Sequence, residues 1–335
     1  MSVSSVERST AWVRAHWPRI RKVAVAGFIC MVVVMLGMAA TRVEWVKVLD
    51  AVDAMPGRAL WLAGLIAAAS YMVYGGFDVL GKLYTGHELA WWKSLAVGCI
   101  SYAFTMSLGA PVGGVGLRLR LYGRMGLKQG IILRVMAFSL ASNWMGYMVL
   151  SGVVLAAGAV SLPTEWNPGE GALRAVGVLM VVAALAYPGV CGFSKVRSRT
   201  VWGHEIDLPP PGVALTQLAI GALNWMLIAA VIYMLMQQKV AYAPVLGALL
   251  ISAIGGVLVR IPGGLGVIET VFMTLLASPS LSRYEILGAV LAYRAVYYIV
   301  PLLLAGVLYL AIEAGLERES KTDTPDVRCT NYPYR

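Results

Sequence analysis

Long apolar runs separated by short polar segments dominate the pattern of this chain. Eight runs approach or exceed the roughly 20 residues that a helix needs to cross a bilayer. The segments between them are too short for a soluble domain of ordinary size. The pattern predicts an all-α polytopic membrane protein with one membrane domain, 23–312. The runs lie approximately at 23–40, 59–80, 94–125, 131–157, 173–193, 214–235, 245–276 and 286–312.

Composition supports this interpretation. Of the 335 residues, 59% are apolar and only 13% are charged, whereas soluble domains carry about 25% charged residues. A soluble globular protein, a disordered chain and a disulfide-stapled secreted domain are therefore excluded as classes. A basic interfacial segment is expected at 1–22, and a mobile cytoplasmic tail at 313–335.

Two of the runs contain residues that break helices. The third run carries Pro111, Gly113, Gly114 and Gly116, and the seventh carries Pro262 followed by a glycine cluster. Proline lacks an N–H group and blocks the helix, and clustered glycines weaken it further. The freed backbone groups must be satisfied by protein or by a wet cavity. We therefore expect each run to form a broken, re-entrant helix pair.

The distribution of basic residues predicts the topology. If both broken runs are re-entrant and the N-terminus is cytoplasmic, the inner segments hold 19 of the 27 Lys and Arg residues, the outer segments hold six, and Arg260 and Arg294 stay in the membrane. This satisfies the positive-inside rule and places both termini in the cytoplasm. Each half, about 23–160 and 173–312, then has three spanning helices and one broken pair. An odd number of crossings inverts the second half relative to the first.

The segment from Arg260 to Glu269 is the main candidate for a binding site. A charge at membrane depth costs about 2.5–3.5 kcal/mol on insertion scales, so two charges flanking a helix break need a reason. Gly263, Gly264 and Gly266 allow close approach of a ligand to the backbone. A half-helix starting near Gly266 would point its N–H groups at an anion, and Arg260 would bind a phosphate in a fork. The alternative is an internal ion pair that locks the hairpin.

Two further arginines join this candidate site. Arg118 is the basic residue nearest the first break and could draw in an anionic lipid headgroup. The alternative for Arg118 is anchoring by the positive-inside rule. Arg294 lies well inside the last apolar run, where its partner would be Glu269, Asp78 or a bound phosphate.

Catalytic, metal and cofactor signatures are missing from the sequence. The four cysteines show no CxxC or metal-ligand spacing, and the three histidines all lie in polar segments. The chain contains no GxSxG, HExxH or GxxxxGK[ST] motif. We therefore expect no cofactor, no metal and no enzyme activity. The net charge of +10 follows the positive-inside rule and requires no nucleic-acid partner.

Several motifs together resemble a known family. RIPGGLGVIE at 260–269, VGGVGLR at 112–118 and LAYRAVYY at 291–298 are similar to the membrane region of lysylphosphatidylglycerol synthases, the multiple-peptide-resistance factor family. YGGFD at 74–78, SYAF at 101–104 and SNWMGY at 142–147 resemble its YbhN-type inner-membrane proteins. The similarity covers nearly the whole chain, and the cytosolic synthase domain of that family is not present in it. The resemblance implies lipid handling in the bacterial inner membrane, without lysine transfer.

These observations predict a phospholipid flippase, transporter or lipid-binding protein that handles anionic headgroups. Arg260, Arg118 and Arg294 would hold phosphate, and Glu269 would tune Arg260 or couple to protons. One alternative is a non-transporting scaffold for lipid enzymes. The other is an intramembrane lipid-modifying enzyme that uses Asp78, Glu269 or a serine. Protein partners and oligomeric state are left open.

Overall fold

The computed structural model describes residues 45–160, 169–194, 198–201, 204–259 and 264–322. The chain divides into two compact units, Met1–Lys47 and Val48–Arg335. Of the first unit only the last three residues are described, and they begin helix α2 (Trp45–Asp53). The expected interfacial segment at 1–22 and the first apolar run, at 23–40, lie outside the described residues.

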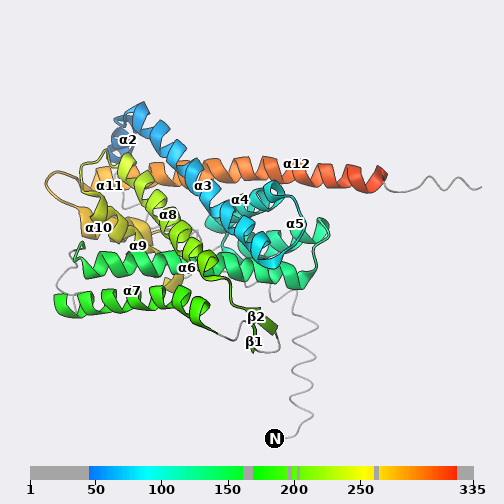
Figure 1. Cartoon of the computed structure of the whole chain (residues 1–335). Coiled ribbons are helices and arrows are strands. Elements are labelled where there is room, and N and C mark those ends of the chain that lie inside the picture. Colours follow the sequence, from blue (N-terminus) through cyan, green and yellow to red (C-terminus); the bar gives the residue numbers. More distant parts are fainter. Residues whose placement is uncertain (1–44, 161–168, 195–197, 202–203, 260–263, 323–335) are drawn as a thin grey trace, which may run out of the picture. The chain divides into compact units, whose positions relative to one another are not determined.

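The prediction of an all-α membrane protein is confirmed (Figure 1). Six helical segments in the described part of the chain are long and apolar enough to cross a membrane: Gly57–Thr85, Gln129–Ala156, Glu170–Phe193, Pro211–Leu235, Tyr242–Val259 and Arg283–Leu316. After α2, the helices are α3 (Gly57–Thr85), α4 (Trp91–Leu108), η1 (Ala110–Leu117), α5 (Arg118–Arg124), α6 (Gln129–Ala156), α7 (Glu170–Phe193), α8 (Pro211–Leu235), α9 (Tyr242–Val259), α10 (Val267–Leu276), α11 (Arg283–Arg294), η4 (Ala295–Ile299) and α12 (Val300–Thr322).

A short hairpin, which the hydrophobic pattern does not predict, joins α7 to α8. Strands β1 (Ser198–Val201) and β2 (His204–Asp207) pair antiparallel, with Ser198 opposite Asp207. The hairpin lies in a polar connection, outside the candidate membrane spans, and leaves the all-α class unchanged.

Both broken runs break at their glycine-rich segments. α4 ends at Leu108. The next residue, Gly109, has a φ of +89°, which suits glycine, and the chain continues as the π-helical segment η1 and then α5. The second run divides into α9 and α10, and Gly264 and Gly266 also have positive φ. η1 packs back on α4, and α10 packs back on α9. That these hairpins turn back within the bilayer, and that the two halves are inverted, stay predictions.

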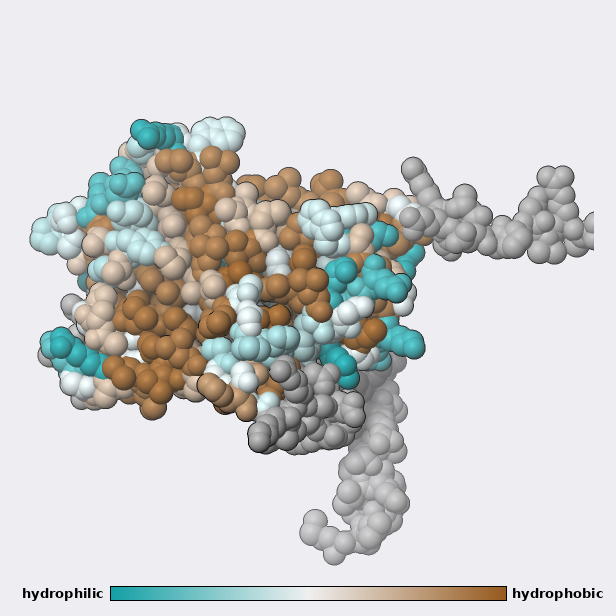
Figure 2. Space-filling model, in the orientation of Figure 1, coloured by the Kyte–Doolittle hydropathy of each residue, from teal (hydrophilic) through white to brown (hydrophobic). Residues whose placement is uncertain are grey.

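The central packing joins the two predicted halves. α3 packs along α8, and α6 packs along both α7 and α8. Gly146 of α6 and Gly221 of α8 meet so closely that a Cβ atom on either would overlap the backbone of the other helix. Small residues at such a crossing let two membrane helices approach closely. In Figure 2 hydrophobic residues cover the middle of the visible face, and hydrophilic residues gather toward its ends.

α12 is tied to α5 by a cluster of charges. Glu313 is buried, accepts a 2.8 Å hydrogen bond from Arg120 Nε and pairs with Arg124. The Tyr309 hydroxyl donates to the same carboxylate at 2.9 Å. α12 continues to Thr322, so the tail predicted at 313–335 begins inside a helix.

His87 is buried in the loop between α3 and α4. Its ring lies edge-on to Tyr122, with centroids 6.2 Å apart, and neither ring nitrogen has a hydrogen-bond partner among the described residues. Burial, aided by the nearby charge of Lys82, lowers the pKa of His87, and Asp78 opposes the shift. Because the charged form is disfavoured here, the imidazole is neutral at pH 7.

Acidification is therefore expected to destabilise the fold through His87. The unfolded chain binds a proton at an ordinary histidine pKa of about 6.5, above the pKa in the folded protein, so stability is lost as pH falls below that value. His87→Phe removes this proton uptake and should flatten the fall of the unfolding temperature between pH 7 and pH 5. Thermal unfolding of the purified protein in detergent measures it. His204→Gln is the control, and an unchanged slope in His87→Phe would contradict the assignment.

Candidate functional site

The second helix break forms a compact cluster of charges. α10 begins at Val267, as the sequence indicates, with Gly266 at its N-cap. The Gly266 N–H donates to Glu269 Oε2 at 2.8 Å, which caps the first turn of the half-helix. The other carboxylate oxygen, Oε1, accepts from Arg294 Nε at 2.7 Å. Arg294 also donates to the Gly264 carbonyl at 3.3 Å. Of the two side chains expected as partners of Arg294, Glu269 and Asp78, Arg294 pairs with Glu269, and a bound phosphate stays a prediction.

This cluster has the chemistry of an anion site. Two positive elements, the guanidinium of Arg294 and the N-terminus of α10, meet at one carboxylate. The side chains of Arg294 and Glu269 are 12% and 14% exposed, so the pair is shielded but not sealed. A phosphate is a stronger bidentate partner for arginine than a backbone carbonyl, and it also suits a helix N-terminus. The donors that Glu269 occupies are therefore of the kind that binds a phosphate group.

The first helix break is held by a more deeply buried pair. Arg118 Nε and one terminal nitrogen donate to the two oxygens of Asp78 at 3.0 and 2.9 Å. The Asp78 and Arg118 side chains are only 0% and 5% exposed. Tyr122 also donates to Asp78, and Arg118 reaches the hydroxyl of Ser139 and the Gly114 carbonyl.

All three nitrogens of Arg118 are thus engaged inside the protein. In this arrangement the guanidinium presents no free edge to a lipid phosphate. The role of Arg118 as a headgroup ligand stays a prediction, and it requires the pair with Asp78 to open. What the two breaks share is an arginine that joins a carboxylate to a glycine carbonyl of the break.

The other residues predicted at the first break, Pro111, Gly113, Gly114 and Gly116, contribute to the backbone packing of the break. A Cβ atom on Gly113 would overlap the backbone of Phe104 and Thr105, so only glycine lets η1 pack on α4. Gly114 supplies the carbonyl that Arg118 binds, and Pro111 lies in the first turn of η1. A Cβ atom on Gly116 would come 3.4 Å from the Pro111 carbonyl, an ordinary contact.

Arg260, Pro262 and Gly263 lie outside the described residues, so their roles stay predictions. Gly264, on the edge of that gap, is described. Within the ranges that the structure describes, no three His, Cys, Asp or Glu side chains gather as a group that could hold a metal.

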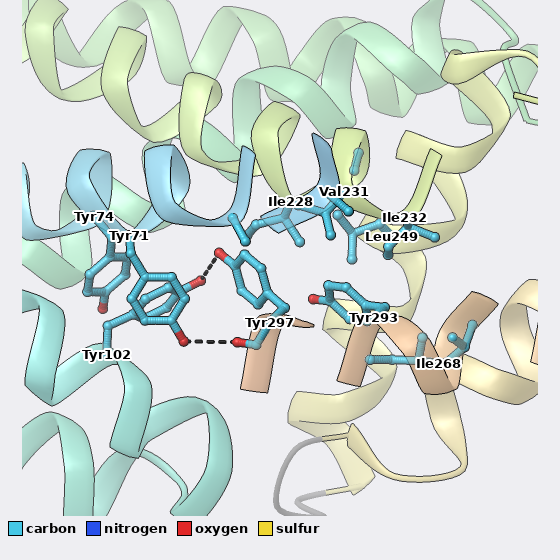
Figure 3. Packing of buried hydrophobic residues seen from close by; sticks show 14 of the residues in the cluster. Tyr71, Tyr74, Tyr102, Ile228, Val231, Ile232, Leu249, Ile268, Tyr293 and Tyr297 are labelled. Atoms are coloured by element: carbon cyan, nitrogen blue, oxygen red, sulfur yellow. Dashed lines mark hydrogen bonds between the residues drawn. The ribbon is translucent and has the colours of Figure 1, made fainter. Parts of the chain in front are cut away.

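Buried tyrosines, among them Tyr71, Tyr102 and Tyr297, gather in the core of the bundle (Figure 3). The guanidinium carbon of Arg118 lies 6.0 Å from the ring centroid of Tyr74. The Tyr74 ring stacks on that of Tyr102, with centroids 3.6 Å apart. The hydroxyl of Tyr102 is 3.0 Å from that of Tyr297. The guanidinium carbon of Arg294 lies 5.6 Å from the ring centroid of Tyr298, the residue after Tyr297. These tyrosines pack against one another in the core of the bundle.

Sequence reasoning missed two features of this region. Asp78 is the buried partner of Arg118, although its position suggests a residue near a helix end that faces the interface. The cost of a charge inside the apolar run 59–80 would have identified it. The second feature is the π-helical segment η4, which directly follows Arg294. Pro301, inside the last apolar run, is the signal that would have revealed it.

Comparison with known proteins finds two relatives that match most of this chain. No family model matches the chain. The inner membrane protein YbhN of Escherichia coli strain K12 is 40% identical over 303 residues, which is 90% of this chain and 95% of that protein. Uncharacterized protein slr0712 of Synechocystis sp. is 28% identical over 293 residues, which is 85% of this chain and 90% of that protein.

A more distant similarity covers only part of a larger enzyme. Phosphatidylglycerol lysyltransferase of Bacillus subtilis is 25% identical over 249 residues, which is 73% of this chain but 28% of the enzyme. Six apolar helices and the match to an inner membrane protein place this chain in the inner membrane as a multi-pass protein. The chain therefore belongs to the family of the inner membrane protein YbhN, which is related to the membrane region of the phosphatidylglycerol lysyltransferases.

Proposed function

We propose that this protein moves anionic phospholipids across the inner membrane and binds their headgroups at the second helix break. The observation that carries the proposal is the arrangement of Glu269, which caps α10 and pairs with Arg294 at one point. Both interactions end at the break between α9 and α10, where non-helical backbone allows close approach of a ligand.

The proposed exchange replaces one anion by another. A lipid phosphate takes the place of Glu269 on Arg294 and receives the N–H groups at the start of α10. Glu269 then becomes free to pair with another cation or to accept a proton. When the lipid leaves, Glu269 returns and the cluster is again neutral. When the displaced Glu269 has taken up a proton or paired with another cation, the site holds a headgroup without leaving a bare charge in the membrane.

The relationship to lipid enzymes supports a role connected with membrane lipids. The distant relative is named for phosphatidylglycerol, an anionic phospholipid, and its match covers 73% of this chain. The shared part is the membrane region, whereas most of that enzyme lies outside the match. We infer that the shared region handles the lipid and that this chain acts without the amino-acid transfer step. Its cytoplasmic termini and its choice of anionic over neutral headgroups belong to the same proposal.

Translocation of fluorescent lipids in proteoliposomes tests the proposal. The wild-type protein should move anionic lipids faster than neutral ones, and Arg294→Gln should slow the movement at least tenfold. The reason is that a hydrogen bond to a charged group contributes about 1.5–3 kcal/mol, and 1.4 kcal/mol corresponds to tenfold. Glu269→Gln should change the rate and its pH dependence, because it removes the competing anion.

The exposed pair of Arg174 and Glu170 provides a matched control. It joins the same residue types at 3.8 Å on α7, with side chains 60% and 83% exposed. Arg174→Gln should leave translocation unchanged. If Arg294→Gln keeps the full rate, the site is wrong. If the wild type moves no lipid, the result favours the non-transporting scaffold. Conversion of a labelled phospholipid to a product would instead indicate an enzyme.

A further inference from the structure

The helix that carries Arg294 changes form immediately after this residue. α11 ends at Arg294, and residues Ala295–Ile299 form the π-helical segment η4. The N–H of Val300 donates to the Ala295 carbonyl, the five-residue spacing of a π-helix. Such segments are rare in proteins, and they frequently occur at functional sites. The direction of Arg294 relative to α12 therefore depends on whether this turn is π-helical or α-helical.

Pro301 explains why the α-helix is interrupted at this position. In an α-helix the carbonyl of Tyr297 would accept from the N–H of residue 301, four positions later. Pro301 has no N–H, and its ring would clash with that carbonyl. The wider π turn relieves the clash, and the Tyr297 carbonyl has lost its α-helical donor. A carbonyl without a donor is strongly disfavoured in a membrane helix.

Tyr71 supplies the missing donor. Its hydroxyl, on α3, donates to the Tyr297 carbonyl at 3.0 Å, as the dashed line in Figure 3 shows. Both residues are buried. The hydroxyl of Tyr297 makes separate contacts, with Ser70 at 2.6 Å and with Tyr102 at 3.0 Å. Tyr71 therefore bonds to the backbone of η4, whereas Ser70 and Tyr102 bond to the side chain of Tyr297 in η4.

We propose that Tyr71 is a positioning residue for the pair of Arg294 and Glu269. Its hydroxyl replaces the donor that Pro301 lacks, stabilises the π-helical form of η4 and thereby fixes the direction in which Arg294 points. Without it, the Tyr297 carbonyl loses this donor, and the π turn at Ala295–Ile299 is no longer favoured over one at a neighbouring position. A shift of one residue across Arg294 would rotate this side chain by about 100°, since an α-helix has 3.6 residues per turn. Arg294 would then leave Glu269 and Gly264.

A set of coupled variants tests the proposal. The coupling of Arg294 to Glu269 is measured first, from the unfolding temperatures of Arg294→Gln, Glu269→Gln and the double variant in detergent. This coupling should be present in the wild type and lost in a Tyr71→Phe background. Tyr102→Phe is the matched control, because it removes a similarly buried hydroxyl that bonds to the side chains of Tyr297 and Asn224 instead of the backbone of η4. In that background the coupling should persist.

Pro301→Ala provides a second, independent arm. It restores an N–H for the Tyr297 carbonyl, so Tyr71→Phe should have little further effect on the unfolding temperature when it is combined with Pro301→Ala. If Tyr71→Phe alone does not fold, recovery of folding in this combination supports the proposal, and failure of the combination to fold overturns it. An intact coupling in Tyr71→Phe also overturns it.

The role of Arg294 in lipid movement rests on the proposed function. The proposed function and the positioning role of Tyr71 can fail separately. If translocation requires neither Arg294 nor Tyr71 while the coupling depends on Tyr71, the proposed function fails and the positioning role stands. If Arg294→Gln stops translocation but Tyr71→Phe leaves both rate and coupling unchanged, the positioning role fails alone.

Discussion

Asp78→Ala is expected to lower the free energy of unfolding by about 3–5 kcal/mol, because it leaves the guanidinium of Arg118 buried without a counter-charge. Asp78 is fully buried, and the pair is bidentate. The substitution also removes the acceptor of the Tyr122 hydroxyl. Thermal unfolding of the purified protein in detergent measures the loss, and the amount of folded protein in the membrane should fall with it.

A double variant separates the charge from the packing. Asp78→Leu together with Arg118→Met replaces the pair by apolar side chains, which is often neutral or stabilising at buried sites. We expect it to recover most of the unfolding temperature that Asp78→Ala loses. If the recovered protein no longer moves lipid, the first break has a functional role for its charges. A double variant as unstable as Asp78→Ala would show that the destabilisation does not come from an unpaired charge.

Gly146→Leu is expected to prevent the correct packing of α6 on α8. A Cβ atom at this position overlaps the backbone of Gly221 and Ala222, which cannot move aside as a side chain can. The cost should exceed the about 1–3 kcal/mol that is typical of an overpacked core, because the two helices must separate along their length. Size-exclusion chromatography and thermal unfolding in detergent should show an aggregated or strongly destabilised protein.

Gly130→Leu, on the same helix, is the matched control. Gly130 is exposed near the start of α6, and a Cβ atom there meets nothing within 4 Å. It should leave the unfolding temperature nearly unchanged, so that the effect at Gly146 reports the crossing and not the loss of a helical glycine. Comparable stability of the two variants would contradict the close α6–α8 contact.

The sequence by itself determined the class of this protein, because the bilayer imposes a simple rule. A segment that crosses hydrocarbon must satisfy its backbone internally and must be apolar over about 20 residues. The runs 59–80, 131–157, 173–193 and 214–235 therefore match α3, α6, α7 and α8 closely. Proline and clustered glycine act locally on the backbone. The sequence therefore predicted a break at Pro111 to Gly116, which the structure places at Gly109, and the start of α10 near Gly266.

Only the tertiary structure decided which charges meet. Asp78 and Arg118 are 40 residues apart, and Glu269 and Arg294 are 25 residues apart. No local rule connects such residues, because their distance depends on how the helices pack. The sequence allowed Glu269 or Asp78 as the carboxylate partner of Arg294, and the packing of α10 against α11 brings Glu269 to it.

The donor to the Tyr297 carbonyl shows the same division. Pro301 alone dictates that this carbonyl loses its helical donor, and that consequence can be read from the sequence. That the replacement comes from Tyr71, 226 residues away on α3, follows only from the contact between α3 and η4. Local backbone chemistry creates the need for a partner, and the three-dimensional packing determines which residue meets it.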